Sequence, residues 1–172
     1  YAYDASNRLV QVITDLSPND NVIADGQTYT TTYTYDGTSK RVATITQIDG
    51  SSLAITYETS GAFRVTSLVQ TVGASDARTT TIAYFADRTE ITDPRGQVTK
   101  LYTNATDGRL TRVVAPQAFA GATAQQIDYT YDAAGNVLTM VSAGATTTYV
   151  YDANGNVTRV TDANGNITDR TY

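Results

Sequence analysis

The sequence predicts an all-β fold built from tandem repeats, a curved antiparallel strip of β-hairpins. Three observations predict it. The 172 residues are rich in strand and turn formers, with 32 Thr and 13 Tyr, while Lys and Glu together number four. Apolar residues show no helical period of 3.6. A Tyr-x-Tyr-Asp motif followed by Gly recurs along the chain, and repetition of that kind indicates a repeat architecture.

The clearest copies of the repeat lie near the end of the chain. Residues 129–137 read YTYDAAGNV and residues 149–157 read YVYDANGNV, and a half-copy, DANGNI, follows at 162–167. We take the following residues as the repeat signature: Tyr129, Tyr131, Asp132, Gly135, Asn136, Tyr149, Tyr151, Asp152, Gly155, Asn156, Asp162, Gly165 and Asn166.

The spacing of the copies suggests one array over residues 1–172. The second Tyr of each unit serves as a marker: Tyr3, Tyr35, Tyr57, Tyr84, Tyr102, Tyr131, Tyr151 and Tyr172. The base period is about 20 residues, and we expect insertions near residues 17–27, 72–77 and 115–125, where the spacing is stretched. A unit of this length accommodates two short strands and two turns, so we expect roughly fourteen to sixteen strands.

The turn of each unit can be derived from its residues. In Asp152-Ala153-Asn154-Gly155, Asp suits the first turn position and Gly155 suits the left-handed residue that closes a type I turn into a bulged hairpin. Asp132 to Gly135 and Asp162 to Gly165 repeat the pattern.

The two Tyr of each pair are spaced at i and i+2, so both rings face one side of their strand. Over successive units we expect a ladder of Tyr rings, with Tyr and Val covering one sheet face. Val157 and Val160 are three residues apart, which does not fit a flat strand, so we expect a bulge or a twist nearby.

Composition excludes several classes of function. The chain has no His, Cys or Trp, so it has no Ser-His-Asp triad, no thiol nucleophile, no Cys/His zinc site and no disulfide. A net charge of −5 argues against binding to nucleic acid. No apolar run is long enough to span a membrane, and no signal peptide is visible in this segment. The ten Arg are scattered along the sequence rather than clustered.

The tandem Tyr-x-Tyr-Asp-x-x-Gly-Asn motif resembles the YD-repeat or Rhs (rearrangement hotspot) family. The resemblance covers essentially the whole chain and is strongest over residues 149–167. It implies a β-sheet strip that spirals into a hollow shell. In bacterial Rhs polymorphic toxins and insecticidal toxin complexes such shells encapsulate a C-terminal toxin, and in teneurins they serve adhesion. The resemblance therefore implies a secreted or cell-surface bacterial protein, with further repeats and an enclosed toxin domain as partners. The chain begins and ends within a repeat, so we expect it to be a fragment of a longer polypeptide.

Candidate chemical sites are weak. Asp152, Asn154, Asp162 and Asn164 have spacings similar to the start of a calcium loop, but Gly is at position four rather than six and no Glu follows. Asp20, Asn21 and Asp25 form a second oxygen-rich loop. Carboxylate pairs such as Asp152 with Asp162, or Asp20 with Asp25, would serve a glycosidase only at a separation of roughly 5–10 Å. The periodic recurrence of Asp in the turns explains these pairs better. We expect no enzyme activity and no cofactor.

Two further expectations concern contacts. Asp128, Arg159 and Arg170 could pair across strands, and the open strand edges could associate with more chain or with other copies. Three functions follow as hypotheses: a shell segment that encloses a toxin, an adhesion or carbohydrate-binding module that binds through the three inserted loops, and a self-assembling β-fibre.

Overall fold

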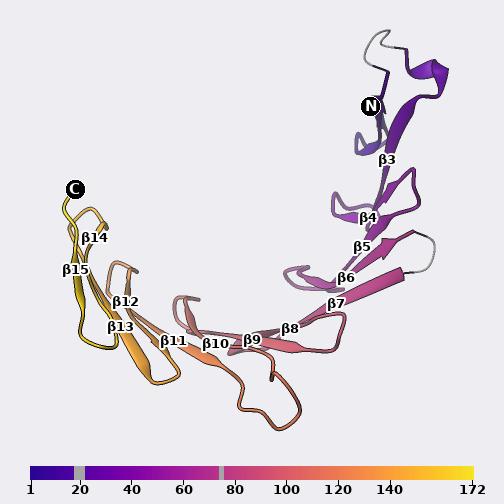
Figure 1. Ribbon diagram of the computed structural model, residues 1–172. Helices are drawn as coiled ribbons and strands as arrows, with labels where there is room; N and C mark the ends of the chain where they lie inside the picture. Colours follow the sequence, from indigo (N-terminus) through magenta and orange to yellow (C-terminus); the bar gives the residue numbers. More distant parts are fainter. Residues whose placement is uncertain (18–21, 74–75) are drawn as a thin grey trace. The chain divides into compact units, whose positions relative to one another are not determined.

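The computed structural model describes residues 1–17, 22–73 and 76–172, and it confirms the all-β prediction. In these residues fifteen strands are hydrogen-bonded in the order in which they follow along the chain, and every described strand pair is antiparallel (Figure 1). The helical content of the described ranges is one short 3-10 turn, η1 (Ile23–Asp25). Within these ranges no helix is long and apolar enough to cross a membrane.

The chain divides into two compact units, residues 1–82 and 83–172. The strands of the first unit are β1 (Ala2–Tyr3), β2 (Leu9–Asp15), β3 (Thr28–Tyr35), β4 (Val42–Gln47), β5 (Ser52–Tyr57), β6 (Val65–Val72) and β7 (Asp76–Tyr84), whose last two residues belong to the second unit. The strands of the second unit are β8 (Arg88–Thr92), β9 (Val98–Thr103), β10 (Leu110–Val114), β11 (Gln126–Tyr131), β12 (Val137–Ser142), β13 (Ala145–Tyr151), β14 (Val157–Thr161) and β15 (Ile167–Asp169).

The sheet has no enclosed core. None of the described side chains is buried, and the accessible surface of 11442 Å² compares with about 8,200 Å² for a compact monomer of this mass. A single layer of strands has no second layer to pack against, so its side chains are covered only in part by their neighbours along and across the strands. The cohesion of the fold therefore comes from hydrogen bonds between strands and from cross-strand side-chain contacts.

The two faces of the sheet differ in chemistry. In the first unit Ile45 lies opposite Tyr33 on one side and Leu53 on the other, so these three side chains share one face. The neighbouring row, Thr32, Thr46 and Ser52, faces the other way. The second unit repeats this alternation, with Tyr149 opposite Val160 and Thr148 opposite Thr161. In these rows one face carries Tyr and aliphatic side chains, and the other carries Thr and Ser.

A bulge in nearly every unit explains the spacing of Val157 and Val160. Tyr151 pairs with Val157 and Val150 pairs with Arg159, which leaves Thr158 as the extra residue. The extra residue shifts the phase of the strand, so Val157 and Val160 lie on the same face. The predicted bulge is thus confirmed and located at Thr158. The same register shift occurs at Tyr3, Tyr35, Tyr57 and Tyr131.

The marker Tyr102 departs from the expected ladder. It lies opposite Arg112, which lies opposite Asp128 in β11, so Tyr102 shares the face of Asp128 and not that of Tyr129. Thr103, paired with Leu110, occupies the position that Tyr151 has in its own unit. The interpretation of Tyr102 as the second Tyr of a unit was wrong by one residue, because in this unit Leu101 and Thr103 replace the two Tyr.

Successive turns alternate between two edges of the sheet, because every hairpin reverses the chain. We call the edge with the turns that follow the Tyr-x-Tyr strands the tyrosine rim; in the second unit its turns begin at Phe85, Asn104, Asp132 and Asp152. We call the other edge the opposite rim. Both long loops lie on it, and each is closed by one main-chain hydrogen bond: Leu16 N–H to Gln27 O and Ala115 N–H to Gln125 O, both 2.8 Å.

The expected insertions map onto the structure as follows. Within residues 17–27, Ser17 and 22–27 belong to the loop after β2, and residues 18–21, including Asp20 and Asn21, lie outside the described residues. Residues 115–125 form the loop between β10 and β11. Of residues 72–77, Val72 ends β6 and Asp76 and Ala77 begin β7, while 74 and 75 lie outside the described residues. Part of the stretch at residues 72–77 therefore lengthens β6 and β7.

Candidate functional site

The most regular site of this chain is the turn that ends each Tyr-x-Tyr strand. In the turn after β13 the Asp152 carboxylate accepts hydrogen bonds from the main-chain N–H groups of Asn154 and Asn156, both at 2.9 Å. The side-chain Nδ2 of Asn156 donates to the second carboxylate oxygen at 2.9 Å. Main-chain bonds from Asp152 N–H to Asn156 O and from Gly155 N–H to Asp152 O complete the turn. One Asp thus anchors the main chain of the whole turn.

The turns at Asp132 and Asp162 have the same construction. Asn136 Nδ2 donates to Asp132 at 2.9 Å, and Asn166 Nδ2 donates to Asp162 at 2.7 Å. Gly135, Gly155 and Gly165 have φ of 98°, 84° and 83°, the left-handed conformation that the sequence predicts for them. The Asp132 and Asp152 turns lie on the tyrosine rim, and the Asp162 turn lies on the opposite rim.

Gly155→Ala is expected to destabilise the chain by about 1–2 kcal/mol, the cost of a Cβ in the left-handed region. Asn7 occupies the equivalent position in the first turn with φ 57°, so Asn7→Gly should change stability little or raise it slightly. Urea unfolding of both variants checks the pair. Equal losses from the two substitutions would contradict the assignment of strain to this turn position.

The turn aspartates are held in their charged form. Hydrogen bonds from the Asn156 side chain and main chain lower the pKa of Asp152 from the ordinary value of 3.8. Asn136 and Asn166 lower the pKa values of Asp132 and Asp162 in the same way. Donors aimed at a carboxylate favour the ionised group over the protonated one.

Acid is therefore expected to weaken the turns. A carboxyl group whose pKa is lower in the folded than in the unfolded chain contributes stability above the unfolded pKa and loses it as pH falls through the folded pKa. Stability should be level near neutral pH and decline below about pH 4. Urea midpoints measured from neutral to strongly acidic pH check this. A triple variant with Asn at positions 132, 152 and 162 should show a shallower acid decline, and an unchanged decline would contradict the prediction.

In four repeats a tyrosine hydroxyl at the end of a strand bonds to the preceding strand. Tyr151 Oη donates a hydrogen bond of 2.8 Å to the carbonyl of Val137, the first residue of β12. Val137 has no partner in β13, because the ladder between these strands begins at Thr139 and Thr148. The phenol thus supplies the donor that the main chain of β13 does not provide. We call this contact the tyrosine latch.

The tyrosine latch recurs in both units. In each case the last residue of a strand donates to the first residue of the strand before it: Tyr35 to Leu9 at 2.7 Å, Tyr57 to Val42 at 2.8 Å, and Tyr131 to Leu110 at 2.7 Å. Partial burial raises the pKa of the Tyr151 phenol, which keeps it protonated and able to donate.

Arginines at the end of the turn reinforce the tyrosine rim, which the sequence interpretation missed. Arg8 pairs with Asp4 at 2.7 Å, lies over the Tyr35 ring at 4.6 Å, and donates to the carbonyls of Gly37 and Ser39 in the following turn. A guanidinium suits this place because it can stack on a ring and donate several hydrogen bonds at once.

Other turn-closing arginines act similarly. Arg41 pairs with Asp36 at 2.6 Å and lies over Phe63 at 4.3 Å, and Arg109 lies over Tyr131 at 5.7 Å and donates to Asp132 O. The signal was present in the sequence. Arg8, Arg41, Arg64 and Arg109 each precede the aliphatic residue that starts a strand, as Asn136 and Asn156 do. The ten Arg are thus partly ordered by the repeat rather than scattered.

Where the structure describes them, the residues considered as metal ligands or catalytic carboxylates are not arranged for either role. Asp152 and Asp162 lie at opposite ends of the five-residue strand β14, about 17 Å apart along it, which exceeds the separation in glycosidases. Asn154 and Asn164 donate their main-chain N–H groups to these carboxylates. Among the described residues no group of three or more His, Cys, Asp or Glu is arranged to hold a metal ion.

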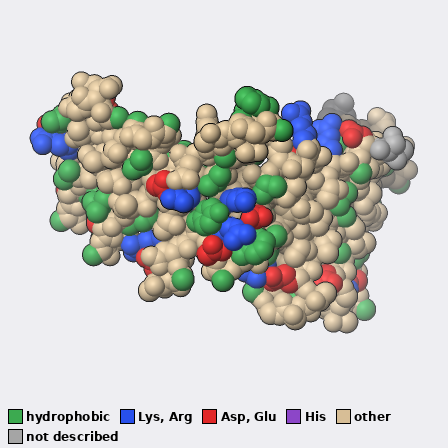
Figure 2. All heavy atoms as spheres, turned by 90° about the horizontal axis from the view of Figure 1, so that it is seen from below, with side chains coloured by type: hydrophobic (Ala, Val, Ile, Leu, Met, Phe, Trp, Pro, Cys, Tyr) green, Lys and Arg blue, Asp and Glu red, His purple; other side chains and the backbone are tan. Residues whose placement is uncertain are grey.

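Two of the three residues expected to pair across strands do so. Asp128 pairs with Arg112 and Arg159 pairs with Asp169, both at 2.6 Å and both directly across neighbouring strands. The sequence did not give the register of these strands, so the partners Arg112 and Asp169 were not predicted. Figure 2 shows Lys and Arg side chains lying beside Asp and Glu on the face in view, rather than in a patch of one sign.

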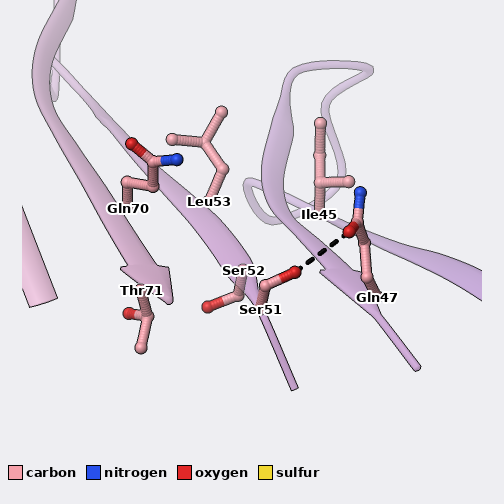
Figure 3. Close-up of a pocket in the computed structure, with 7 residues that line it drawn as sticks. All are labelled: Ile45, Gln47, Ser51, Ser52, Leu53, Gln70 and Thr71. Atoms are coloured by element: carbon pink, nitrogen blue, oxygen red, sulfur yellow. Dashed lines mark hydrogen bonds between the residues drawn. The ribbon is translucent and has the colours of Figure 1, made fainter. Parts of the chain in front are cut away.

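A shallow hollow of about 460 Å³ lies over β4, β5 and β6 (Figure 3). Ile45, Leu53 and Gln70 contribute to its lining, and Ser51 Oγ donates to Gln47 Oε1 at 3.0 Å at one end. Its lining contains no ionisable side chain, so the hollow offers neither an acid nor a base for catalysis.

Comparisons with known proteins agree with this architecture. The RHS Repeat family matches residues 131–167 and 151–172. No curated protein matches the sequence. The fold is similar to parts of three solved structures: TcdB2-TccC3-Cdc42 (TM-score 0.71, 16% identity), TcdB2-TccC3 without its hypervariable C-terminal region (0.72, 15%) and the Photorhabdus luminescens Tc holotoxin pore (0.71, 16%). Each likeness covers 92% of this chain but only 8–9% of the solved chain.

Proposed function

The C-terminal part of this chain consists of RHS repeats, and from that premise we propose that the chain is a structural wall segment of an RHS-type β-shell that encloses a C-terminal toxin. The wall acts by excluding other molecules from the enclosed domain, so the segment needs no catalytic residues and no cofactor. The segment would belong to a secreted or cell-surface bacterial protein.

One observation carries the proposal: a sheet of fifteen described strands with no buried side chain on either face. A globular domain of this length normally buries a core, because burial of apolar surface is its main source of stability. A wall segment instead needs a large sheet area with both faces accessible. The Tyr and aliphatic face and the Thr face of this sheet provide surfaces of different chemistry for an interior and an exterior.

The tyrosine rim supplies the cohesion that such a wall requires. The latches, together with Arg8 and Arg109, join one turn to its neighbour, so hairpins are held together along one edge without a core beneath them. The similar solved structures support the proposal of an enclosed C-terminal domain, since one of them is described as lacking its hypervariable C-terminal region. A segment of the present kind would surround such a region.

The proposal is tested on the source polypeptide. We expect an intact mass many times 18.4 kDa, with a small C-terminal piece that copurifies and resists protease until the shell is unfolded. Peptide mapping of the residues on either side of Tyr1 and Tyr172 identifies the flanking repeats. A source polypeptide near 18.4 kDa would overturn the proposal, because so few strands do not close around a domain.

A further inference from the structure

The opposite rim of the second unit carries a groove that the wall function does not use. It lies between the turn after β8, the start of β9 and the loop of residues 115–125, and its volume is about 810 Å³. Val98, Val114 and Phe119 contribute apolar lining, and Arg95 and Lys100 contribute charge.

The groove is positively charged although the chain has a net charge of −5. The lining contains no Asp or Glu, and Lys100 Nζ forms an ion pair with Glu90, which lies outside the lining, at 3.6 Å. Arg95 is exposed at the turn. The groove therefore favours a ligand that combines a carboxylate with an apolar side chain.

The loop beside the groove holds an exposed aromatic anchor. Residues 115–125 contain no charged side chain, and Ala122 N–H donates to Phe119 O at 3.0 Å to form a turn at the tip. Phe119 is 72% exposed. A large ring held outward by a closed loop is the kind of residue that dominates binding energy at protein interfaces.

The first unit carries a segment of matching chemistry on its own opposite rim. In the loop after β2, Leu16 and Ile23 are 59% and 55% exposed. Asp25 follows Ile23 in the short turn η1, and its carboxylate is oriented by Ser17 Oγ at 3.0 Å and Gln27 N–H at 2.8 Å. This segment offers an aliphatic side chain and a carboxylate two residues apart.

We propose that the groove of one copy binds the Ile23–Asp25 turn of a second copy. Ile23 packs against Phe119 and Val98, and the Asp25 carboxylate approaches Arg95 and Lys100. Each copy carries both surfaces, so the contact joins one copy of the chain to another. The contact area is small and rimmed by charge, so the association should be weak and should weaken further as salt is added.

Sedimentation velocity of the 172-residue chain over a concentration series tests the proposal. We expect reversible dimerisation, which Phe119→Ser and Ile23→Ser each weaken about tenfold. Tyr172→Ser is the matched control, because Tyr172 is 77% exposed and lies outside the groove. It should leave dimerisation unchanged, and far-ultraviolet circular dichroism of all variants should match the original chain.

A charge exchange separates this contact from association through strand edges. Arg95→Asp and Asp25→Arg should each weaken dimerisation about tenfold, and an equimolar mixture of the two variants should associate again as a heterodimer. A monomeric chain at every concentration overturns the proposal. It is equally overturned if association persists in Phe119→Ser but disappears in Thr168→Lys, which places a charge on the edge strand β15.

Discussion

Tyr151→Ala is expected to lower the stability of the second unit by about 3 kcal/mol, whereas Tyr151→Phe should cost about 1 kcal/mol. Alanine removes both the half-buried ring and the 2.8 Å hydrogen bond to Val137 O, while phenylalanine removes only the hydrogen bond. Hydrogen exchange of the β12 and β13 amides is a suitable readout, because repeat arrays can open locally.

The first Tyr of the same pair provides the control. Tyr149 lies on the same face as Tyr151, opposite Val160, and no hydrogen bond from its hydroxyl is described. Tyr149→Phe should therefore leave amide protection in β12 unchanged. Equal effects of the two phenylalanine variants would show that the latch does not stabilise the rim.

A four-residue Gly-Ser insertion is expected to unfold the repeat when placed between Ala153 and Asn154, but to be tolerated between Ala120 and Gly121. At the first site it separates Asp152 from Asn156 and so breaks the hydrogen bonds that close the turn. At the second site it lengthens a loop on the opposite rim, where doubling a loop costs only about 0.6 kcal/mol.

Protection of amides in β13 and β14 checks this comparison, with limited proteolysis as a second readout. The first insertion should expose these strands to exchange and cleavage, while the second should change only the loop. If both insertions are tolerated equally, the two rims do not differ in the way that the latches and the turn-closing arginines imply.

Much of the fold could be predicted because the repeat is specified by interactions between residues that are close in sequence. Gly155 and Asp152 specify their turn through main-chain conformation and a side chain that reaches only a few residues along the chain. The phase change between Val157 and Val160 likewise revealed a bulge, although not its position. Such features depend on residues close in sequence, and sequence patterns report them well.

Contacts between neighbouring repeats could not be predicted in the same way. The Arg8 contact with Tyr35 and the pairing of Arg112 with Asp128 depend on the register between neighbouring strands, which the sequence did not give. Tyr102 misled for a related reason: a Tyr at nearly the right interval looks like a marker, but its register places it on the other face. The absence of burial among the described side chains was also not visible, because composition alone does not say whether an apolar face is covered.

The order of the strands has a consequence for biosynthesis. Every described strand pairs with the strand that follows it in the chain, and such local topologies form quickly because little loop entropy opposes them. A hairpin of this kind can close as soon as its second strand has left the ribosome, without waiting for residues that are synthesised much later. The sheet can therefore grow in the direction of translation, one hairpin at a time, and the latches of Tyr35, Tyr57, Tyr131 and Tyr151 secure strands as they are added.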